Sequence, residues 1–320
     1  MTLLQIQDLH VTFSQNKQAV RGVDLAIKQG QTLAIVGETG SGKSAIAKSI
    51  TRLFPKNVAQ IQGKILFQGK DLLSATDREL QAIRGKEIGM IFQDPLTSLN
   101  PTMKIGNQIL EIVQRSQPGL STSKAVSVVH ELLKQVGIPD PEHRASDFPH
   151  TLSGGMRQRV MIAQALASAP KLLIADEPTT ALDVTIQAQI FFLLKELQKK
   201  YDMSILLITH DLSLVAGFCD WVYVLYAGMV VESASVDDLF YNPKHPYTQG
   251  LLRSIPKIHL YPEEPLLPIA GSAPSGSFFP TGCAFHPRCP KKHQRCEETT
   301  PPLFFLQQNQ CTRCWLEESP

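Results

Sequence analysis

One run of eight residues carries the clearest chemical signal in the sequence: Gly37, Glu38, Thr39, Gly40, Ser41, Gly42, Lys43 and Ser44. Glycines leave backbone N–H groups free to surround a phosphate, because no side chains stand in the way. In such a loop the lysine is suited to reach the β- and γ-phosphates of a nucleotide, and the second serine to ligate Mg²⁺. A chance glycine-rich turn is the alternative, and the order of the flanking elements argues against it.

The residues on either side of this loop predict the elements that position it. Residues 32–36 form an apolar run typical of a buried parallel strand, and residues 45–54 have a helical pattern. A helix that begins directly after the loop adds aligned N–H groups and the positive end of its dipole. We therefore expect a strand, a phosphate-binding loop and a helix in that order.

Two adjacent carboxylates, Asp176 and Glu177, follow another apolar run at residues 172–175. Side chains at the C-terminal end of a parallel strand face the nucleotide crevice of an α/β sheet. Asp176 is suited to hold Mg²⁺ through water, and Glu177 to polarise the water that attacks a γ-phosphate. Alone, the pair also fits a solvated loop entry, but together with the glycine-rich loop it indicates nucleotide hydrolysis.

A second glycine-containing motif, residues 152–158, precedes a helix predicted to run to about residue 169. Ser153 is suited to cap that helix, and Gly154 and Gly155 expose its N-terminal amides. The motif is either an ordinary helix cap or a second phosphate-binding surface. Because one nucleotide does not need two such surfaces from one chain, we expect a head-to-tail dimer in which this helix serves the partner's ATP.

Four further residues are candidates for the same site. His210 and Gln93 each follow a predicted strand, where the histidine can hydrogen-bond the γ-phosphate and the glutamine can sense Mg²⁺. Asp183 belongs either to the nucleotide site or to the N-cap of a helix expected at residues 185–199. Phe13 is either a ring that stacks on adenine or a core aromatic residue.

The hydrophobic pattern predicts an α/β fold with added subdomains. Alternation over residues 3–13 and 20–27, and over an edge strand at 61–67, indicates antiparallel strands beside the parallel sheet. Residues 96–169 carry apolar residues at helical spacing and predict a helical subdomain. The expected fold class is a P-loop NTPase (RecA-like) core with an antiparallel β subdomain, a helical subdomain and a small cysteine-rich C-terminal extension.

Composition predicts two domains, a core over residues 1–240 and an extension over 241–320, because prolines and cysteines accumulate after about Asp238. The 31 lysines and arginines balance 29 acidic residues, so charge does not indicate a nucleic-acid partner. The apolar runs are shorter than the roughly 20 residues that cross a bilayer, and no signal-peptide pattern is present. We therefore expect a cytoplasmic protein.

Together these motifs resemble the nucleotide-binding subunit of an ABC transporter over essentially the whole chain. The resemblance implies ATP and Mg²⁺ as ligands, two subunits that sandwich two ATP molecules, and closure that drives membrane partners. It assigns family roles to residues already named, as the Walker A loop (37–44), Q-loop glutamine (Gln93), signature motif (152–158), Walker B end (Asp176 and Glu177), D-loop aspartate (Asp183) and switch histidine (His210).

Three segments resemble more narrowly the oligopeptide and dipeptide importers, namely residues 94–101, 179–190 and 242–248. This resemblance implies a subunit that energises peptide import, peripheral at the cytoplasmic face of the inner or plasma membrane. It implies a second ABC ATPase subunit, commonly in a heterodimer, two transmembrane permease subunits docked through residues 94–103, and an extracytoplasmic substrate-binding protein. Nickel importers share much of this pattern, so a nickel or other small-solute importer is the alternative.

Two other function classes fit the nucleotide motifs less well. Soluble ABC ATPases of translation or DNA repair usually carry two cassettes or long insertions, whereas this chain has one cassette and a short helical insert. A regulator that holds nucleotide without turnover has no need of Glu177 and His210. We therefore expect an enzyme that hydrolyses ATP.

Five of the six cysteines lie in the last forty residues. In a cytosolic protein such a cluster favours a metal site over disulfides. Members of the peptide-importer family carry a similar pattern that holds a [4Fe–4S] cluster. The resemblance implies the ligands Cys283, Cys289, Cys296 and Cys314, with Cys311 as the alternative fourth residue. Four thiolates also suit structural zinc, and a set of metal-free thiols is the third alternative.

Overall fold

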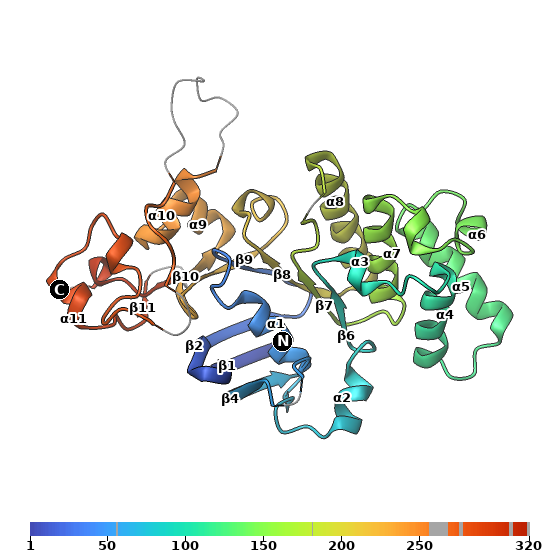
Figure 1. The fold of residues 1–320 in the computed structure, drawn as a ribbon, viewed down its shortest axis with the longest axis horizontal. Coiled ribbons are helices and arrows are strands. Elements are labelled where there is room, and N and C mark those ends of the chain that lie inside the picture. Colours follow the sequence, from blue (N-terminus) through green and yellow to red (C-terminus); the bar gives the residue numbers. More distant parts are fainter. Residues whose placement is uncertain (56, 181, 256–267, 275–277, 307–309, 319–320) are drawn as a thin grey trace. The chain divides into compact units, whose positions relative to one another are not determined.

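The computed structural model of the chain describes residues 1–55, 57–180, 182–255, 268–274, 278–306 and 310–318 (Figure 1). The chain divides into two compact units, one of residues 1–74 and 208–320 and one of residues 75–207. The boundary expected at residue 240 rests on composition and stays a prediction. Among the described helices, none is both long enough and apolar enough to cross a membrane.

The first unit contains the predicted antiparallel sheet, with strand order β2-β1-β4-β5. Its strands are β1 (Thr2–Phe13), β2 (Lys17–Lys28), β4 (Ala59–Phe67) and β5 (Lys70–Asp71). Alternation along β1 buries Leu4 and Ile6, and after an irregularity between Ile6 and Leu9 it buries Leu9 and Val11, as expected for a half-exposed strand. The expectation of an edge strand at residues 61–67 was wrong, because β4 lies between β1 and the short β5.

The second sheet of this unit has the strand order β11-β12-β10-β9-β3. Its strands are β3 (Thr32–Val36), β9 (Trp221–Tyr226), β10 (Met229–Ser235), β11 (Phe304–Phe305) and β12 (Cys311–Thr312). β3 is buried throughout and pairs in parallel with β9, with Leu33 opposite Trp221. Helix α1 (Lys43–Thr51) begins after the glycine-rich loop that follows β3. The predicted strand, loop and helix are therefore confirmed.

The C-terminal region of the first unit is anchored to β10. Its helices are α9 (Val236–Tyr241), α10 (Pro246–Arg253), η4 (His286–Arg288), α11 (Gln294–Glu298) and η6 (Trp315–Glu317). Two further short helices of the unit, η1 (Ser14–Asn16) and η3 (Leu212–Leu214), lie outside this region. β12 pairs with β10. The buried carboxylate of Glu232 on β10 accepts hydrogen bonds from the main-chain N–H groups of Lys244 and His245, at 2.7 and 2.8 Å. The extension is thus continuous with the sheet that carries β3.

The second unit combines a sheet with a group of helices. Its strands have the order β8-β7-β6, with bounds Ser204–Thr209, Leu172–Asp176 and Ile88–Ile91, and the unit boundary falls within β8. β6 and β7 are parallel, with Ile88 opposite Leu172. The helices are α2 (Asp77–Ile83), α3 (Pro95–Ser98), α4 (Ile105–Ser116), α5 (Thr122–Gln135), α6 (Pro141–Arg144), η2 (Pro149–Thr151), α7 (Gly154–Leu166) and α8 (Val184–Tyr201).

Helices α4 to α7 gather on one side of this unit, as the green part of Figure 1 shows. α4 buries Ile105, Ile109 and Val113, which recur every fourth residue along one face. That face packs against neighbouring helices, including α5 and α7. The helical pattern predicted for residues 96–169 is confirmed.

Candidate functional site

The loop between β3 and α1 packs too closely against its neighbours to carry side chains at two positions. A Cβ atom on Gly37 would overlap the carbonyl oxygen of Leu225, and one on Gly42 would overlap that of Ala19. Gly42 also has φ of 107°, a left-handed conformation that favours glycine. The loop is therefore held in shape by the backbone around it, which suits a preformed phosphate site.

Lys43, the first residue of α1, folds back over the loop that precedes it. Its Nζ donates hydrogen bonds to the carbonyl oxygens of Gly37 and Glu38, at 2.7 and 3.0 Å, and the residue is only 4% exposed. Ser44 follows in the first turn of α1 and is half-buried. Both residues thus lie at the N-terminus of a helix, where an anion is stabilised.

The carboxylate of Glu177 is held by two neutral donors in the second unit. Gln93 Nε2 and Thr180 Oγ1 each donate to Glu177 Oε2, both at 3.0 Å. Glu177 has φ of 48°, an uncommon conformation for a residue other than glycine and one that occurs at functional sites. Asp176, which precedes it at the end of β7, is 5% exposed. The predicted pair Gln93 and Glu177 is brought together.

Thr180 is a functional candidate that the sequence analysis did not identify. It lies three residues after Glu177, so its hydroxyl reaches the carboxylate across one turn of chain. A hydroxyl three residues after the expected catalytic carboxylate is a feature of the sequence from which this contact could have been predicted. In combination with Gln93, this hydroxyl fixes the orientation of the carboxylate that is predicted to act as the base.

The signature motif and Asp183 both cap helices of the second unit. Ser153 Oγ accepts a hydrogen bond from the Met156 N–H at 3.3 Å at the start of α7, and Asp183 Oδ1 accepts one from the Ile186 N–H at 2.9 Å at the start of α8. The capping interpretations are confirmed. The roles of Ser153, Gly154, Gly155 and Asp183 toward ATP stay predictions, and Ala181 of the D-loop lies outside the described residues.

The predicted nucleotide residues come from both units. The first unit supplies Phe13, residues 37–44 and His210, and the second supplies Gln93, residues 153–155, Asp176, Glu177 and Asp183. The Phe13 ring is half-buried and packs edge-on against Phe54 at 5.6 Å between centroids, so an adenine-stacking role is a prediction that the structure leaves open. His210 is exposed just after β8.

Four of the cysteines line one small cavity in the first unit, namely Cys283, Cys289, Cys296 and Cys314. Cys311 does not line this cavity and lies on β12 instead. Burial raises the pKa of the thiols of Cys283 and Cys289, and it raises that of Cys314 to about 12. The same four residues that the family resemblance implied are therefore gathered together.

The cavity is not arranged as a metal site. Its volume of about 10 Å³ has room for roughly one water molecule. Among the described residues, no group of three or more Cys, His, Asp or Glu side chains has metal-binding geometry. The cavity thus offers the predicted cluster four sulfur donors, but the described side chains are not in metal-binding geometry.

His245, which follows the buried Glu232 anchor, lines the same cavity. Its Nδ1 accepts a hydrogen bond from the Tyr247 N–H at 3.0 Å, and burial lowers its pKa to about 3. Its Nε2 has no hydrogen-bond partner among the described residues. Burial outweighs the main chain of Arg313, which acts on the ring in the opposite direction and raises its pKa. Because Nδ1 accepts a hydrogen bond, the neutral ring carries its proton on Nε2, so a buried N–H group belongs to a residue that lines the same cavity as the four cysteines.

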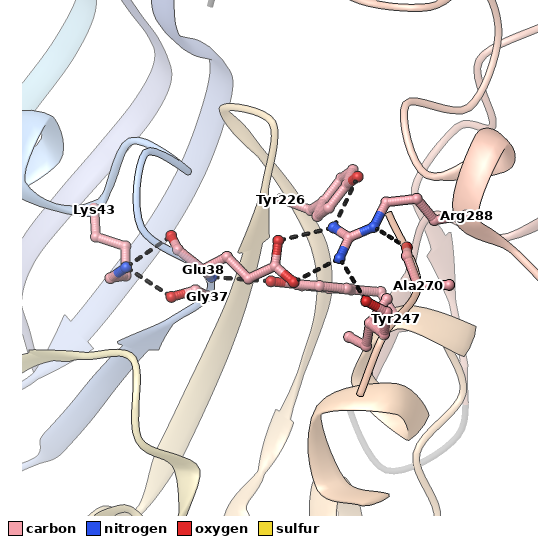
Figure 2. Close-up of polar contacts among 8 residues, drawn as sticks. Gly37, Glu38, Lys43, Tyr226, Tyr247, Ala270 and Arg288 are labelled. Atoms are coloured by element: carbon pink, nitrogen blue, oxygen red, sulfur yellow. Dashed lines mark hydrogen bonds and ion pairs between the residues drawn. The ribbon is translucent and has the colours of Figure 1, made fainter. Parts of the chain in front are cut away.

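A polar network joins the glycine-rich loop to the C-terminal region (Figure 2). The guanidinium of Arg288 forms a two-pronged ion pair with the carboxylate of Glu38, with N–O distances of 2.8 and 2.9 Å. The hydroxyl of Tyr247 accepts a hydrogen bond from the main-chain N–H of Glu38 at 2.9 Å. The sequence analysis did not identify Arg288 or Tyr247, because nothing local in the sequence marks such distant partners.

Sequence profiles match the chain over two regions. A profile described as "ABC transporter" matches residues 20–180, and one described as "Oligopeptide/dipeptide transporter, C-terminal region" matches residues 231–296. The oligopeptide transport ATP-binding protein OppD of Bacillus subtilis is 52% identical over 318 residues, which cover 98% of this chain and 88% of that protein. The dipeptide transport ATP-binding protein DppD of the same organism is 48% identical, covering 99% and 95%.

Solved structures show the same core fold. The dimeric structure of MJ0796, described as a bacterial ABC transporter cassette, is 29% identical with a TM-score of 0.65, and the match covers 73% of this chain and 98% of that one. A structure of cbiO1 from Clostridium perfringens, part of the ABC transporter complex cbiONQ, is 30% identical with a TM-score of 0.65, covering 75% and 91%. The expected α/β nucleotide-binding fold is confirmed.

Proposed function

The chain belongs to the ABC transporter family of ATP-binding proteins, and from this premise we propose that it is the ATP-hydrolysing subunit of a di- or oligopeptide importer. The observation that carries the proposal is the similarity to peptide-transport ATP-binding proteins along nearly the whole chain, including the C-terminal region. The preformed loop after β3 and the oriented carboxylate of Glu177 supply the chemistry that such a subunit needs.

In this proposal the loop and helix α1 bind the triphosphate. Lys43 leaves the carbonyl groups it now contacts and pairs with the β- and γ-phosphates, and Phe13 stacks on the adenine. Mg²⁺, when bound, neutralises phosphate charge. The hydroxyl of Ser44 and the carboxylate of Asp176, with Gln93, are the oxygen donors that suit this ion, Asp176 acting through water.

Glu177 acts as the general base that takes a proton from the attacking water. The donors Gln93 and Thr180 hold its Oε2, which leaves the carboxylate oriented for that step. His210 donates a hydrogen bond to the γ-phosphate as charge develops on it.

The second phosphate-binding surface serves a partner subunit. Ser153, Gly154 and Gly155 at the N-terminus of α7, with Asp183, face the ATP of a second ABC ATPase in a head-to-tail dimer, in line with the dimeric structure of the similar cassette MJ0796. That second subunit is a related but different chain. The assembly also contains two permease subunits and an extracytoplasmic binding protein.

The chain would act at the cytoplasmic face of the membrane, attached through the permeases. Residues 94–103 form the docking segment. The exposed apolar side chains of Leu96 within it and of Phe92 just before it support a protein contact there. Leu96 is 62% exposed at the start of α3. Closure of the ATPase dimer would be transmitted through this segment.

An uptake assay tests the substrate. In cells that lack this chain, we expect uptake of labelled di- and oligopeptides to be lost and uptake of nickel to be unchanged. The wild-type chain should restore peptide uptake to the level of the parent cells. Loss of nickel uptake with normal peptide uptake would contradict the proposal and support the alternative importer.

We further propose that the cysteine-lined cavity holds a [4Fe–4S] cluster, with zinc as the alternative ion. The support is that Cys283, Cys289, Cys296 and Cys314 line one cavity, and that His245, whose buried Nε2 is a donor suited to hydrogen-bond a thiolate or sulfide, lines it too. The group would tie Cys283, Cys289, Cys296 and Cys314 into one structural centre.

Metal analysis tests this centre on protein purified without oxygen. We expect about four irons and four sulfides per chain, lost in Cys289→Ser. Cys311→Ser is the matched control and should keep the full content, because Cys311 lies on β12 outside the cavity. Zinc in place of iron would identify the centre as a structural zinc site. A metal-free chain, or equal loss in Cys311→Ser, would contradict the ligand set.

A further inference from the structure

The cysteine-rich loop reaches the nucleotide loop through one side chain. Arg288 lies in η4, between Cys283 and Cys289, and its guanidinium meets the carboxylate of Glu38 in the glycine-rich loop (Figure 2). The Arg288 side chain is 6% exposed and that of Glu38 is 28% exposed. A bidentate ion pair between an arginine and a carboxylate that are this little exposed is a strong and geometrically specific interaction.

The guanidinium of Arg288 is itself fixed in place. Its Nε donates to the carbonyl oxygen of Ala270 at 2.9 Å, and Nη1 lies 3.4 Å from the hydroxyl oxygen of Tyr226. The ion pair with Glu38 raises the pKa of the guanidinium further above its usual value, so Arg288 is charged at any physiological pH. The position of Glu38 is thus set by a rigid partner.

The main chain of Glu38 is held from the same side. Its N–H donates to the hydroxyl of Tyr247, a fully buried residue. The Tyr247 ring packs on Tyr226 and on Phe285, at 4.6 and 5.3 Å between centroids. Phe285 lies in the same cysteine-bounded segment as Arg288, so that segment supports residue 38 through an ion pair and through an aromatic cluster.

The charge of Glu38 has a consequence for nucleotide binding. Its carbonyl oxygen accepts a hydrogen bond from Lys43, the residue proposed to bind the phosphates. A free carboxylate in this loop would repel a triphosphate, because like charges interact strongly where water is partly excluded. Arg288 cancels that charge with two short hydrogen bonds.

We propose that Arg288 is a positioning residue of the nucleotide site, which neutralises Glu38 and holds the glycine-rich loop in the shape that binds MgATP. The inference rests on the proposed ATP-binding function. It makes segment 283–289 the physical link between the cysteine-lined cavity and the nucleotide loop. It also gives the C-terminal region a role in ATP affinity.

A double-mutant cycle on the full chain tests the proposal by equilibrium binding of MgATP. We expect Arg288→Gln to weaken binding about tenfold, a typical coupling between charged groups in direct contact. Adding Glu38→Gln to that variant removes the uncompensated carboxylate and should recover most of the affinity. ATP hydrolysis by Arg288→Gln should show a raised KM with kcat changed by less than about twofold.

Two outcomes would overturn the proposal. One is wild-type affinity in Arg288→Gln. The other is a double variant that binds as weakly as Arg288→Gln, which would show that Arg288 does not act by neutralising Glu38. If Arg288→Gln does not fold, Arg288→Lys replaces it in the cycle. Lysine keeps the charge but loses the fork, so we expect intermediate affinity, and wild-type affinity there would contradict the proposal.

The matched control is Arg295→Gln, which removes an arginine from the same cysteine-rich region. Arg295 stacks on Trp315 and pairs with Glu318, at a site that does not touch the glycine-rich loop. We expect its MgATP affinity to stay within about twofold of wild type. A wild-type chain that does not bind MgATP would refute the proposed function, whereas normal binding by both wild type and Arg288→Gln would refute only this inference.

Discussion

Replacing Glu177 with glutamine is expected to lower the rate of ATP hydrolysis by about 10²- to 10⁴-fold, the usual contribution of a positioned general base. The amide has nearly the same shape and keeps an oxygen that can accept hydrogen bonds from Gln93 and Thr180. The glycine-rich loop and Lys43 are unchanged, so MgATP binding should stay within about twofold of wild type. Steady-state hydrolysis and equilibrium binding, measured on the same preparation, separate the two effects.

The control for this variant is Glu196→Gln on the exposed face of α8. It makes the same chemical change in the same unit, away from the residues assigned to the site, and should hydrolyse ATP at the wild-type rate. Hydrolysis by Glu177→Gln at the normal rate would exclude Glu177 as the base. Equal loss in both variants would show that the effect is not specific to Glu177.

Replacing Ser153 with arginine is expected to abolish hydrolysis by the assembled transporter while this chain's own MgATP binding is kept. The bulky cation at the N-terminus of α7 blocks the surface proposed to contact the partner's ATP. The phosphates of the chain's own ATP are expected to bind residues 37–44, which the substitution does not change. The measurements are ATPase activity of the assembly and MgATP binding to the isolated chain.

Ser153→Ala is the companion variant, because arginine also removes a helix cap. Loss of the hydrogen bond from the Met156 N–H costs about 1 kcal/mol of helix stability but leaves the surface open. We expect this variant to keep more of its activity than Ser153→Arg. An active Ser153→Arg assembly, or loss of the chain's own ATP binding, would contradict the head-to-tail arrangement.

Local sequence patterns predicted the elements that carry the site. The apolar run at β3, the glycines after it and the helical pattern of α1 lie close together in the chain, so short-range rules identify them. The helix caps Ser153 and Asp183 were predicted for the same reason. Each depends only on residues within one turn of the helix that it begins.

Contacts between distant segments were not predicted. Arg288 and Glu38 are 250 positions apart, and their pairing depends on how the C-terminal region packs on β10. That region is joined to the sheet by the two-residue strand β12 and by the buried carboxylate of Glu232. Such short elements have no periodicity to detect, and a lone glutamate in a strand does not signal an anchor.

The arrangement of the cysteine region was predicted in part. The family resemblance implied Cys314 as the fourth residue, with Cys311 as the alternative. In the structure Cys314 lines the cavity and Cys311 lies on β12. The presence of metal did not follow from the sequence, since iron–sulfur clusters and zinc accept the same thiolate donors. The structure does not favour the cluster over zinc, because the described residues have metal-binding geometry for neither.

Coupled measurement of ATP hydrolysis and peptide accumulation tests the central claim most directly. The chain would be assembled with its partner ATPase, permeases and binding protein in sealed proteoliposomes, oriented so that MgATP reaches the ATPase side. The account predicts that peptide accumulates only with MgATP, in proportion to hydrolysis, and that Glu177→Gln stops both. ATP hydrolysis without peptide accumulation, or accumulation that persists in Glu177→Gln, would contradict it.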